Sequence, residues 1–334
     1  MRFLENLAAW LQQFETIADR QEAYALLRHR LIYISPPELQ RLVELFYPCT
    51  IVRRLVSIVA MRRNIPPYQV QVDKKARADF LRLRRRTLIL GLSDGARIDI
   101  LRHSNVGVLS NEQLVIQTQV DRVKWRSLVD NLRKSQGPDA LFEVVFLVDD
   151  FMGTGSSFLR YDGEDKKWTG KLTKFLQSLT EADRGGVTVL ADGAELCVHH
   201  YLSTQRAAAS MPSLEEQARA KGDVPRGKAS HYTFGTILEP NDCVIPGNVG
   251  DARLVDLTQR YYNPGIRTKH TDVGGVTHLG LGYGGCALPL VLHHNTPNNS
   301  LALIWAEIDS GPDEKDVMRP EMRPLFRRRQ RHTE

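Results

Sequence analysis

The chain has 334 residues, of which 42% are hydrophobic and 25% are charged. These fractions are typical of a folded globular protein, and they exclude collagen-like, disordered and multi-spanning membrane chains. The net charge is +6, and residues 318–334 alone contain six Arg and two Glu. The four cysteines are widely separated, and no apolar run reaches the roughly 18 residues that a bilayer span needs. We therefore expect a cytoplasmic protein with reduced cysteines, without a signal peptide or a membrane segment.

The first part of the chain is predicted to be helical. Apolar residues recur at helical spacing from Arg2 to about Asn64, which indicates three or four helices. The segment from Lys74 to Arg86 contains seven basic residues and one acid, directly ahead of an apolar run. We therefore predict a helical region over residues 1–80, a main domain over 81–310 and a basic tail over 311–334.

In the main domain the pattern changes to short apolar runs, each followed by a polar or glycine-containing loop and a helix-like segment. Such runs are typical of strands that are buried on both faces of a sheet. The sequence therefore predicts an α/β fold with a mainly parallel sheet and helices on both of its faces. The polar stretch at about 203–230 is predicted to be an insertion or a mobile cover. The four clearest runs are Thr87 to Leu92, Glu143 to Val148, Val187 to Ala191 and Leu288 to Leu292.

The most informative segment starts at the second of these runs. There an apolar strand leads into Asp149 and Asp150, then into a loop of glycines and hydroxyl residues, and then into a predicted helix. Glycines and backbone N–H groups at such a loop can surround a phosphate, to which the hydroxyls add donors. The two acids suit the hydroxyls of a sugar or a hydrated Mg²⁺. The loop residues are Gly153, Thr154, Gly155, Ser156 and Ser157.

This segment resembles the phosphoribosyl pyrophosphate motif of type I phosphoribosyltransferases. The resemblance implies that Asp149 and Asp150 are catalytic residues that face the ribose hydroxyls and hold Mg²⁺, directly or through water. It also implies that Gly153 to Ser157 bind the 5′-phosphate. The alternative is an acidic strand end and a helix N-cap in another doubly wound fold. A Walker P-loop is excluded, because no matching glycine-lysine motif occurs.

An upstream segment, Leu90 to Asp99, repeats the order of strand, small polar loop and helix. In the transferase fold the first core strand leads into a pyrophosphate loop, and Ser93, Asp94, Gly95 and Arg97 occupy the matching place. Arg97 would be the charge partner of a diphosphate. The alternative is a tight turn in which Asp94 and Gly95 serve the backbone alone.

Three further residues are predicted to contact a base. Asp192 follows the run Val187 to Ala191, where a base-binding loop lies in the transferase fold. Asn295 and Asn298 belong to a polar segment after the last apolar run, and their side chains suit the edge of a base or the capping of a turn. Together with the Gly-Leu-Ser-Asp-Gly loop, a Ser-Asn-Glu-Gln element and the acid pair, this segment resembles phosphoribosyltransferase-like proteins of bacterial antiviral defence systems.

The resemblance implies a protein that binds phosphoribosyl pyrophosphate or a nucleotide with Mg²⁺ and acts at the anomeric carbon. The alternative is a non-catalytic module of a defence cassette that senses a nucleotide or binds a partner protein or RNA. This alternative is motivated by the interval from Ser104 to Ala140, where active transferases carry a flexible loop and this chain has a helical pattern.

Overall fold

A computed structural model describes residues 2–117, 119–224, 230–272, 274–276, 278–312 and 317–328. Residues 225–229 of the predicted insertion and 329–334 of the predicted tail lie outside this range. The chain divides into two compact units, one over residues 39–237 and one formed by residues 1–38 and 238–334. This division differs from the boundaries near residues 80 and 310 that the sequence predicts. None of the described helices is both long and apolar enough to span a bilayer.

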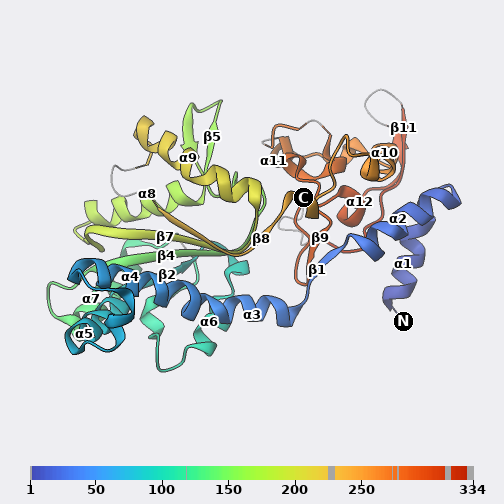
Figure 1. Cartoon of the computed structure of the whole chain (residues 1–334). Coiled ribbons are helices and arrows are strands. Elements are labelled where there is room, and N and C mark those ends of the chain that lie inside the picture. Colours follow the sequence, from blue (N-terminus) through green and yellow to red (C-terminus); the bar gives the residue numbers. More distant parts are fainter. Residues whose placement is uncertain are drawn as a thin grey trace. The chain divides into compact units, whose positions relative to one another are not determined.

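The unit over residues 39–237 is built on a five-stranded parallel sheet, which confirms the predicted α/β class (Figure 1). The strand order is β3-β2-β4-β7-β8, with β4 in the centre. All three pairs among β3, β2, β4 and β7 are parallel, so their carboxyl ends lie at one edge. The strands are β2 (Thr87–Gly91), β3 (Leu114–Val115), β4 (Phe142–Met152), β7 (Leu190–Thr204) and β8 (His231–Leu238).

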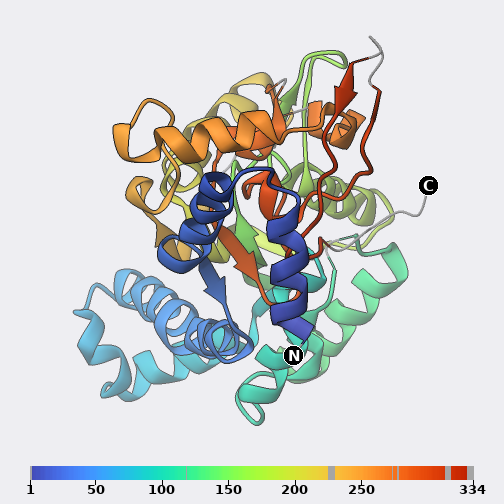
Figure 2. The same cartoon turned by 90° about the vertical axis from the view of Figure 1, so that its right-hand side faces the viewer.

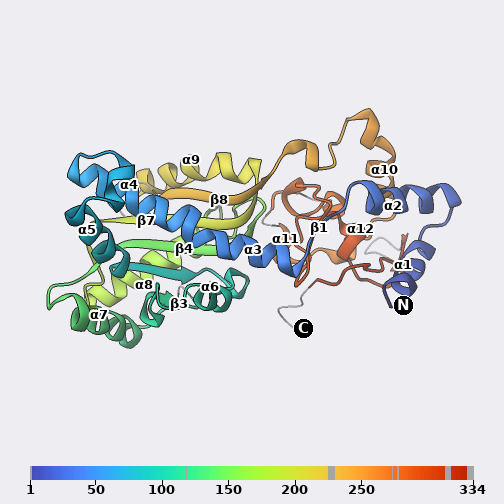
Figure 3. The ribbon, with the colours of Figure 1, turned by 60° about the horizontal axis from the view of Figure 1, so that its bottom comes forward.

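Helices cover both faces of this sheet, and α8 and α9 lie on the face opposite α3 and α4 (Figures 1 and 3). Side chains alternate along β4, so Val145 and Leu147 pack with α7, α8 and α9. Phe146 points to the other face, where it contacts Phe46 of α3 with ring centroids 5.6 Å apart. The helices are α3 (Pro36–Phe46), α4 (Val52–Arg63), α5 (Lys74–Arg85), α6 (Ile98–Ser104), α7 (Arg122–Gln136), α8 (Lys171–Arg184) and α9 (Gln205–Lys221).

Helix α9 corrects the prediction of an insertion or mobile cover at about 203–230. Its Ala207, Met211 and Ala218 are buried in the core of the sheet unit. Its N-cap is Thr204, the last residue of β7, whose side chain accepts a hydrogen bond from the backbone N–H of Ala207. The polar composition misled the prediction because α9 buries one narrow stripe of three small or apolar residues and Glu215, which is paired with Arg219 and Tyr232.

The second unit joins the two ends of the chain (Figure 2). Trp10 is buried and donates from Nε1 to the carbonyl of Leu303 at 2.8 Å. Buried Asp19 accepts from Arg260 at 2.6 Å, and this hydrogen bond holds the pKa of Asp19 well below its ordinary value. The elements are α1 (Arg2–Gln12), α2 (Ile17–His29), β1 (Ile32–Ile34), α10 (Ala252–Arg260), α11 (Lys269–Asp272), β9 (Leu290–Leu292), α12 (Ala302–Trp305), β10 (Gly311–Pro312) and β11 (Met318–Arg319).

Two predicted strands differ from the structure. The run Val187 to Ala191 is only the approach to a much longer strand, β7, which continues to Thr204. The run Leu288 to Leu292 does form a strand, β9, but it pairs with β1 in a separate two-stranded sheet. Apolar runs mark burial and do not identify the partner strand, so the sequence could not separate these cases.

Strand β7 generates a prediction about pH. His199 and His200 are buried, and burial lowers the pKa of His199 to about 3 and that of His200 to about 4. Below pH 6.5 both histidines become protonated in the unfolded chain but stay neutral in the folded chain. The free energy of unfolding therefore falls as the pH falls. Each histidine contributes about 1.4 kcal/mol per pH unit, which gives a loss of about 4 kcal/mol between pH 7 and pH 5.

Urea denaturation at several pH values measures this slope. The double variant His199→Gln/His200→Gln should lose most of it, whereas His103→Gln, at an exposed position, should retain it. An unchanged slope in the double variant would contradict the assignment.

Candidate functional site

The loops after β2 and β4 lie next to each other at the carboxyl edge of the parallel sheet. The first contains Ser93 to Arg97, and the second contains Gly153 to Ser157. Asp149 and Asp150 lie in β4 itself, shortly before its end. Because β2 and β4 are paired through Gly91 and Val148, the two predicted loops are adjacent although more than fifty residues separate them in sequence. The predicted pyrophosphate loop, acid pair and phosphate loop therefore come together.

Asp149 is buried, with a relative exposure of 3%. It accepts a hydrogen bond from Ser93 Oγ on Oδ1 at 2.5 Å, and it forms an ion pair with Lys171 Nζ through Oδ2 at 2.5 Å. Burial acts to raise the pKa of Asp149, but the charge of Lys171, the neighbouring His200 and these hydrogen bonds outweigh it and hold the pKa below its ordinary value. Asp149 is therefore ionised and tied to two other segments.

Asp150 points to the opposite face of β4, because neighbouring residues in a strand alternate. It is partly exposed, and its Oδ1 accepts from the backbone N–H of Phe151 at 2.8 Å. The carboxylate lies against the backbone of Gly95, where an added Cβ would stand 2.3 Å from Oδ2. Only glycine allows this approach. Asp150 is thus the more accessible acid of the pair, and it is set directly beside the predicted pyrophosphate loop.

The predicted phosphate loop is held in place by its neighbours. Gly155 has φ +79°, and a Cβ there would lie 2.3 Å from Cε of Met211 in α9. The hydroxyls of Thr154 and Ser156 are hydrogen-bonded to each other at 2.9 Å. The hydroxyl of Thr204, at the end of β7, donates to the carbonyl of Gly153 at 2.6 Å. The loop conformation therefore depends on glycine at position 155 and on contacts with β7 and α9.

A β-hairpin, and not the predicted helix, follows this loop. Its strands are β5 (Arg160–Asp162) and β6 (Lys167–Thr169), and α8 begins only at Lys171. The first two N–H groups of α8 donate to the carbonyls of Ser157 and Phe158, each at 3.1 Å. These groups are therefore not available to a phosphate, which corrects the expectation of a free helix N-terminus behind the loop.

Arg97 lies at the end of the loop after β2 in an unusual backbone conformation. Its φ of +50° is in the left-handed region, which costs free energy in any residue except glycine. The side chain is partly buried, and its Nε has no hydrogen-bond partner among the residues that the structure describes. The loop is anchored by Tyr201 of β7, whose buried hydroxyl donates to the carbonyl of Ala96 at 3.0 Å. The loop therefore has a fixed position and carries a guanidinium, a group that pairs well with phosphates.

Sequence reasoning missed Lys171 and His200. Lys171 is the first residue of α8 and forms the ion pair with Asp149. His200 pairs with Asp149 across the β4–β7 ladder, and burial makes it neutral near pH 7. A lysine directly after Gly170 at a helix start was a visible signal, but nothing in the spacing links it to an acid 22 residues earlier.

Asp192 does not join this site. Leu190 pairs with Phe142, the first residue of β4, so Asp192 lies near the amino end of β7. The acid pair lies near the carboxyl end of the neighbouring strand. The prediction failed because the strand was expected to end at Ala191, whereas it starts at Leu190.

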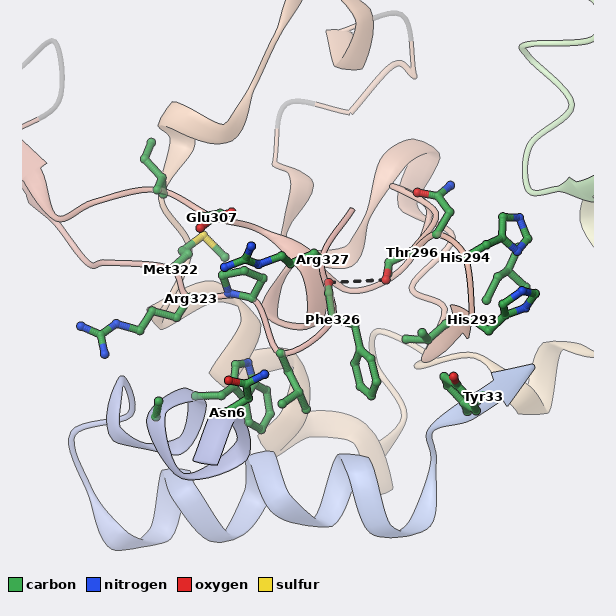
Figure 4. A pocket seen from close by; sticks show the side chains of 18 of the residues that line it. Asn6, Tyr33, His293, His294, Thr296, Glu307, Met322, Arg323, Phe326 and Arg327 are labelled. Atoms are coloured by element: carbon green, nitrogen blue, oxygen red, sulfur yellow. Dashed lines mark hydrogen bonds between the residues drawn. The ribbon is translucent and has the colours of Figure 1, made fainter. Parts of the chain in front are cut away.

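Asn295 and Asn298 lie in the other unit, where their role as base-binding residues stays a prediction. Asn295 lines a pocket of about 880 Å³ together with the adjacent histidines and with residues from both chain ends (Figure 4). The Thr296 hydroxyl donates to the carbonyl of Phe326 at 3.5 Å and fixes one wall. Asn298 uses its backbone carbonyl to accept from the N–H of Tyr283 at 2.6 Å.

The acid pair offers little direct coordination to a metal ion. Both oxygens of Asp149 already have partners, Ser93 and Lys171. Within the described residues no group of three or more His, Cys, Asp or Glu side chains could hold a metal. Asp150 remains as the acid that fits a hydrated cation, which takes most of its ligands from water and phosphate.

The basic segment ahead of β2 is partly neutralised. Arg82 lies 3.5 Å from Asp79, Arg85 lies 3.7 Å from Glu112, and Arg86 forms an ion pair with Glu143 at 3.1 Å. Paired arginines offer less charge to a nucleic acid backbone than the sequence count suggests.

Comparison with known proteins agrees with this geometry. The model of the family PRTase-CE matches residues 7–328. The chain belongs to the PRTase-CE family. This family is phosphoribosyltransferase-like, which confirms the resemblance at the level of the transferase group. The match spans both compact units, so the unit of residues 1–38 and 238–328 is part of the family's pattern. A search of curated proteins gave no match. A search of solved structures also gave none.

The buried ion pair generates the second prediction. Lys171→Met removes the cation and leaves Asp149 charged in the interior, which should lower the free energy of unfolding by about 3 kcal/mol. Lys174→Met, on an exposed position of the same helix, should change it by less than about 0.5 kcal/mol. Urea denaturation at pH 7 measures both.

The double variant Lys171→Met/Asp149→Asn tests the cause. Removing the charge of Asp149 should recover part of the loss. The ion-pair assignment would be contradicted if the double variant lost more free energy of unfolding than the two single variants lose together.

Proposed function

We propose that the chain binds a ribose 5-phosphate donor, phosphoribosyl pyrophosphate or a nucleotide, and acts at its anomeric carbon with Mg²⁺. The observation that carries this proposal is the joint contact of the acid pair with the loop of β2. Ser93 donates to Asp149, and Gly95 allows Asp150 to approach its backbone. Family membership supports the same reading. In this proposal the loop after β2 binds the diphosphate, the acid pair faces the ribose, and the hydroxyl residues after β4 bind the 5′-phosphate.

The two acids have different roles in this proposal. Asp150, which is partly exposed, accepts hydrogen bonds from the ribose hydroxyls. Asp149 is a positioning residue, because its oxygens hold Ser93 and Lys171 in place. Thr154, Ser156 and the backbone of the 153–157 loop bind the 5′-phosphate.

With phosphoribosyl pyrophosphate as donor, the bond between the anomeric carbon and the diphosphate oxygen breaks. The diphosphate leaves with the electron pair, and the acceptor forms the new bond to carbon. Arg97 and the N–H groups of its loop stabilise the negative charge that gathers on the diphosphate. Positioning of the ribose by Asp150 supplies the rest of the catalysis.

Mg²⁺, when bound, would neutralise charge on the diphosphate. Asp150 is the residue that would hold it, through water, and the remaining ligands would come from the donor and solvent. We therefore expect Mg²⁺ to bind tightly only when the donor is present, and the donor to bind tightly only when Mg²⁺ is present.

We further propose that the protein serves a bacterial antiviral defence system, with a partner protein or RNA as its target or regulator. The support is the order of four motifs in the sequence, from the Ser93 loop to Asn298. The alternative is a nucleotide-sensing module without turnover. It is supported by helix α7, which occupies the interval where active transferases carry a flexible loop.

Calorimetric titration with phosphoribosyl pyrophosphate, with and without Mg²⁺, tests the proposal. We expect Mg²⁺-dependent binding that is lost in Asp149→Ala/Asp150→Ala. Gly95→Ala should also lose it, because the new Cβ displaces Asp150, whereas Gly163→Ala, at an open loop position, should bind normally. Absence of binding in the wild-type protein would refute the proposed donor. Release of diphosphate on addition of an acceptor would distinguish an enzyme from a sensor.

Arg97 gives a separate prediction. If its guanidinium contacts the diphosphate, Arg97→Gln should weaken phosphoribosyl pyrophosphate about tenfold or more, since a hydrogen bond to a charged group contributes about 1.5 to 3 kcal/mol. Ribose 5-phosphate, which lacks the diphosphate, should bind with nearly unchanged affinity. If Arg97→Gln weakened the binding of both ligands equally, Arg97 would not contact the diphosphate.

A further inference from the structure

A pocket of about 590 Å³ opens beside the predicted phosphate loop, within the unit of residues 39–237. The hydroxyl residues Thr154 and Ser156 form one side of it. The β5–β6 hairpin and helix α9 form the others. Asp149, Asp150 and the Ser93 loop do not line it. The pocket therefore begins at the phosphate loop and extends away from the acid pair.

The walls of this pocket are aromatic and apolar. Tyr161 and Trp168 pack edge to face on neighbouring strands of the hairpin with ring centroids 5.7 Å apart, and Leu214 of α9 also lines the pocket. Trp168 is buried, with a relative exposure of 6%, and its Nε1 has no hydrogen-bond partner among the described residues. This Nε1 atom is itself shielded from solvent. The pocket thus offers aromatic and apolar surfaces.

The charged side chains that line the pocket are both cations. Arg160 donates to the carbonyl of Ser156 at 3.3 Å, which places it at the phosphate loop. Lys221 lies over the ring of Tyr161, 3.8 Å from its centroid. No carboxylate contributes to the lining. An anionic group between the loop and the aromatic walls would meet two positive charges.

A ligand that ends in a simple 5′-phosphate would leave this space empty. We propose that the ribose 5-phosphate unit is part of a dinucleotide, in which the 5′-phosphate is joined through a second phosphate to another nucleoside. The second base packs against Tyr161, Trp168 and Leu214. Arg160 and Lys221 bind the second phosphate. The pocket volume lies within the range of about 300 to 1,000 Å³ of small-molecule sites.

This inference rests on the proposed function, because it uses the same phosphate loop, and it identifies the class of donor. It favours a dinucleotide over phosphoribosyl pyrophosphate, whose phosphate at position 5 is terminal. The bond that would break joins the anomeric carbon next to the acid pair to the base that it carries. This base leaves with the electron pair, and the acceptor forms the new bond to carbon.

The test compares ribose 5-phosphate with ADP-ribose by calorimetry. ADP-ribose contains the same ribose 5-phosphate unit and adds the second phosphate and adenosine. We expect ADP-ribose to bind the wild-type protein at least tenfold more tightly. Lys221→Gln, which removes one of the two cations assigned to the second phosphate, should reduce this advantage several-fold.

A matched pair of substitutions on α9 isolates the pocket. Ala220→Trp fills it from an exposed position and should abolish the advantage of ADP-ribose while ribose 5-phosphate binds as before. Ser213→Trp, also exposed on α9 and outside the lining, should leave both affinities unchanged. Circular dichroism verifies that the variants are folded.

The outcomes separate the two proposals. Equal affinities of the two ligands for the wild-type protein, or an advantage that survives Ala220→Trp, would overturn the dinucleotide inference and leave the proposed function intact. Binding of neither ligand, while phosphoribosyl pyrophosphate binds, would overturn the inference alone. Absence of binding of all three ligands would refute the proposed function and the inference with it. Binding of ADP-ribose that is insensitive to Asp150→Asn would overturn the inference that its ribose phosphate reaches the acid pair.

Discussion

The site depends on one buried carboxylate. Asp149 lies inside the central strand of the sheet, and its two oxygens contact Ser93 of the preceding loop and Lys171 at the start of α8. A buried charge is costly unless it is paired and hydrogen-bonded, so these three segments can be stable only together. Together with the pairing of β2 and β4 and the anchor from Tyr201 to Ala96, the carboxylate fixes the geometry of this edge.

The alternation of a β-strand divides the acid pair into two different groups. Asp149 points toward α8, where Lys171 and its hydrogen bonds hold it ionised against the effect of burial, and Asp150 points toward Gly95 at a partly exposed position. Two adjacent acids on a loop would share one environment and repel each other. On a strand the sheet separates them, so one can organise the interior while the other remains accessible to a sugar.

The sequence predicted the fold class and the meeting of the two loops, because strand runs and glycine-hydroxyl loops are local patterns and parallel strands align their carboxyl ends. It did not predict the partner of Asp149, since Lys171 comes from a helix whose start follows a hairpin. It also misplaced Asp192, because a long strand with a polar beginning resembles a loop. Strand β9 was recognised, but its partner β1 lies more than 250 residues away, and pairing at that distance leaves no local signal.

The hairpin between the phosphate loop and α8 accounts for two departures from the expected pattern. In its presence the first N–H groups of α8 bond to the carbonyls of Ser157 and Phe158, so in the proposed function the loop itself supplies the donors for a phosphate. The same hairpin carries Tyr161 and Trp168, which with α9 enclose a space beside that loop. If α8 followed the predicted phosphate loop directly, its first N–H groups would lie near a bound phosphate. The chain would then lack the hairpin that carries Tyr161 and Trp168. Because of the two inserted strands, the first two N–H groups of α8 are not free for the predicted phosphate loop. The same strands form the wall of a pocket that begins at this loop and extends away from the acid pair.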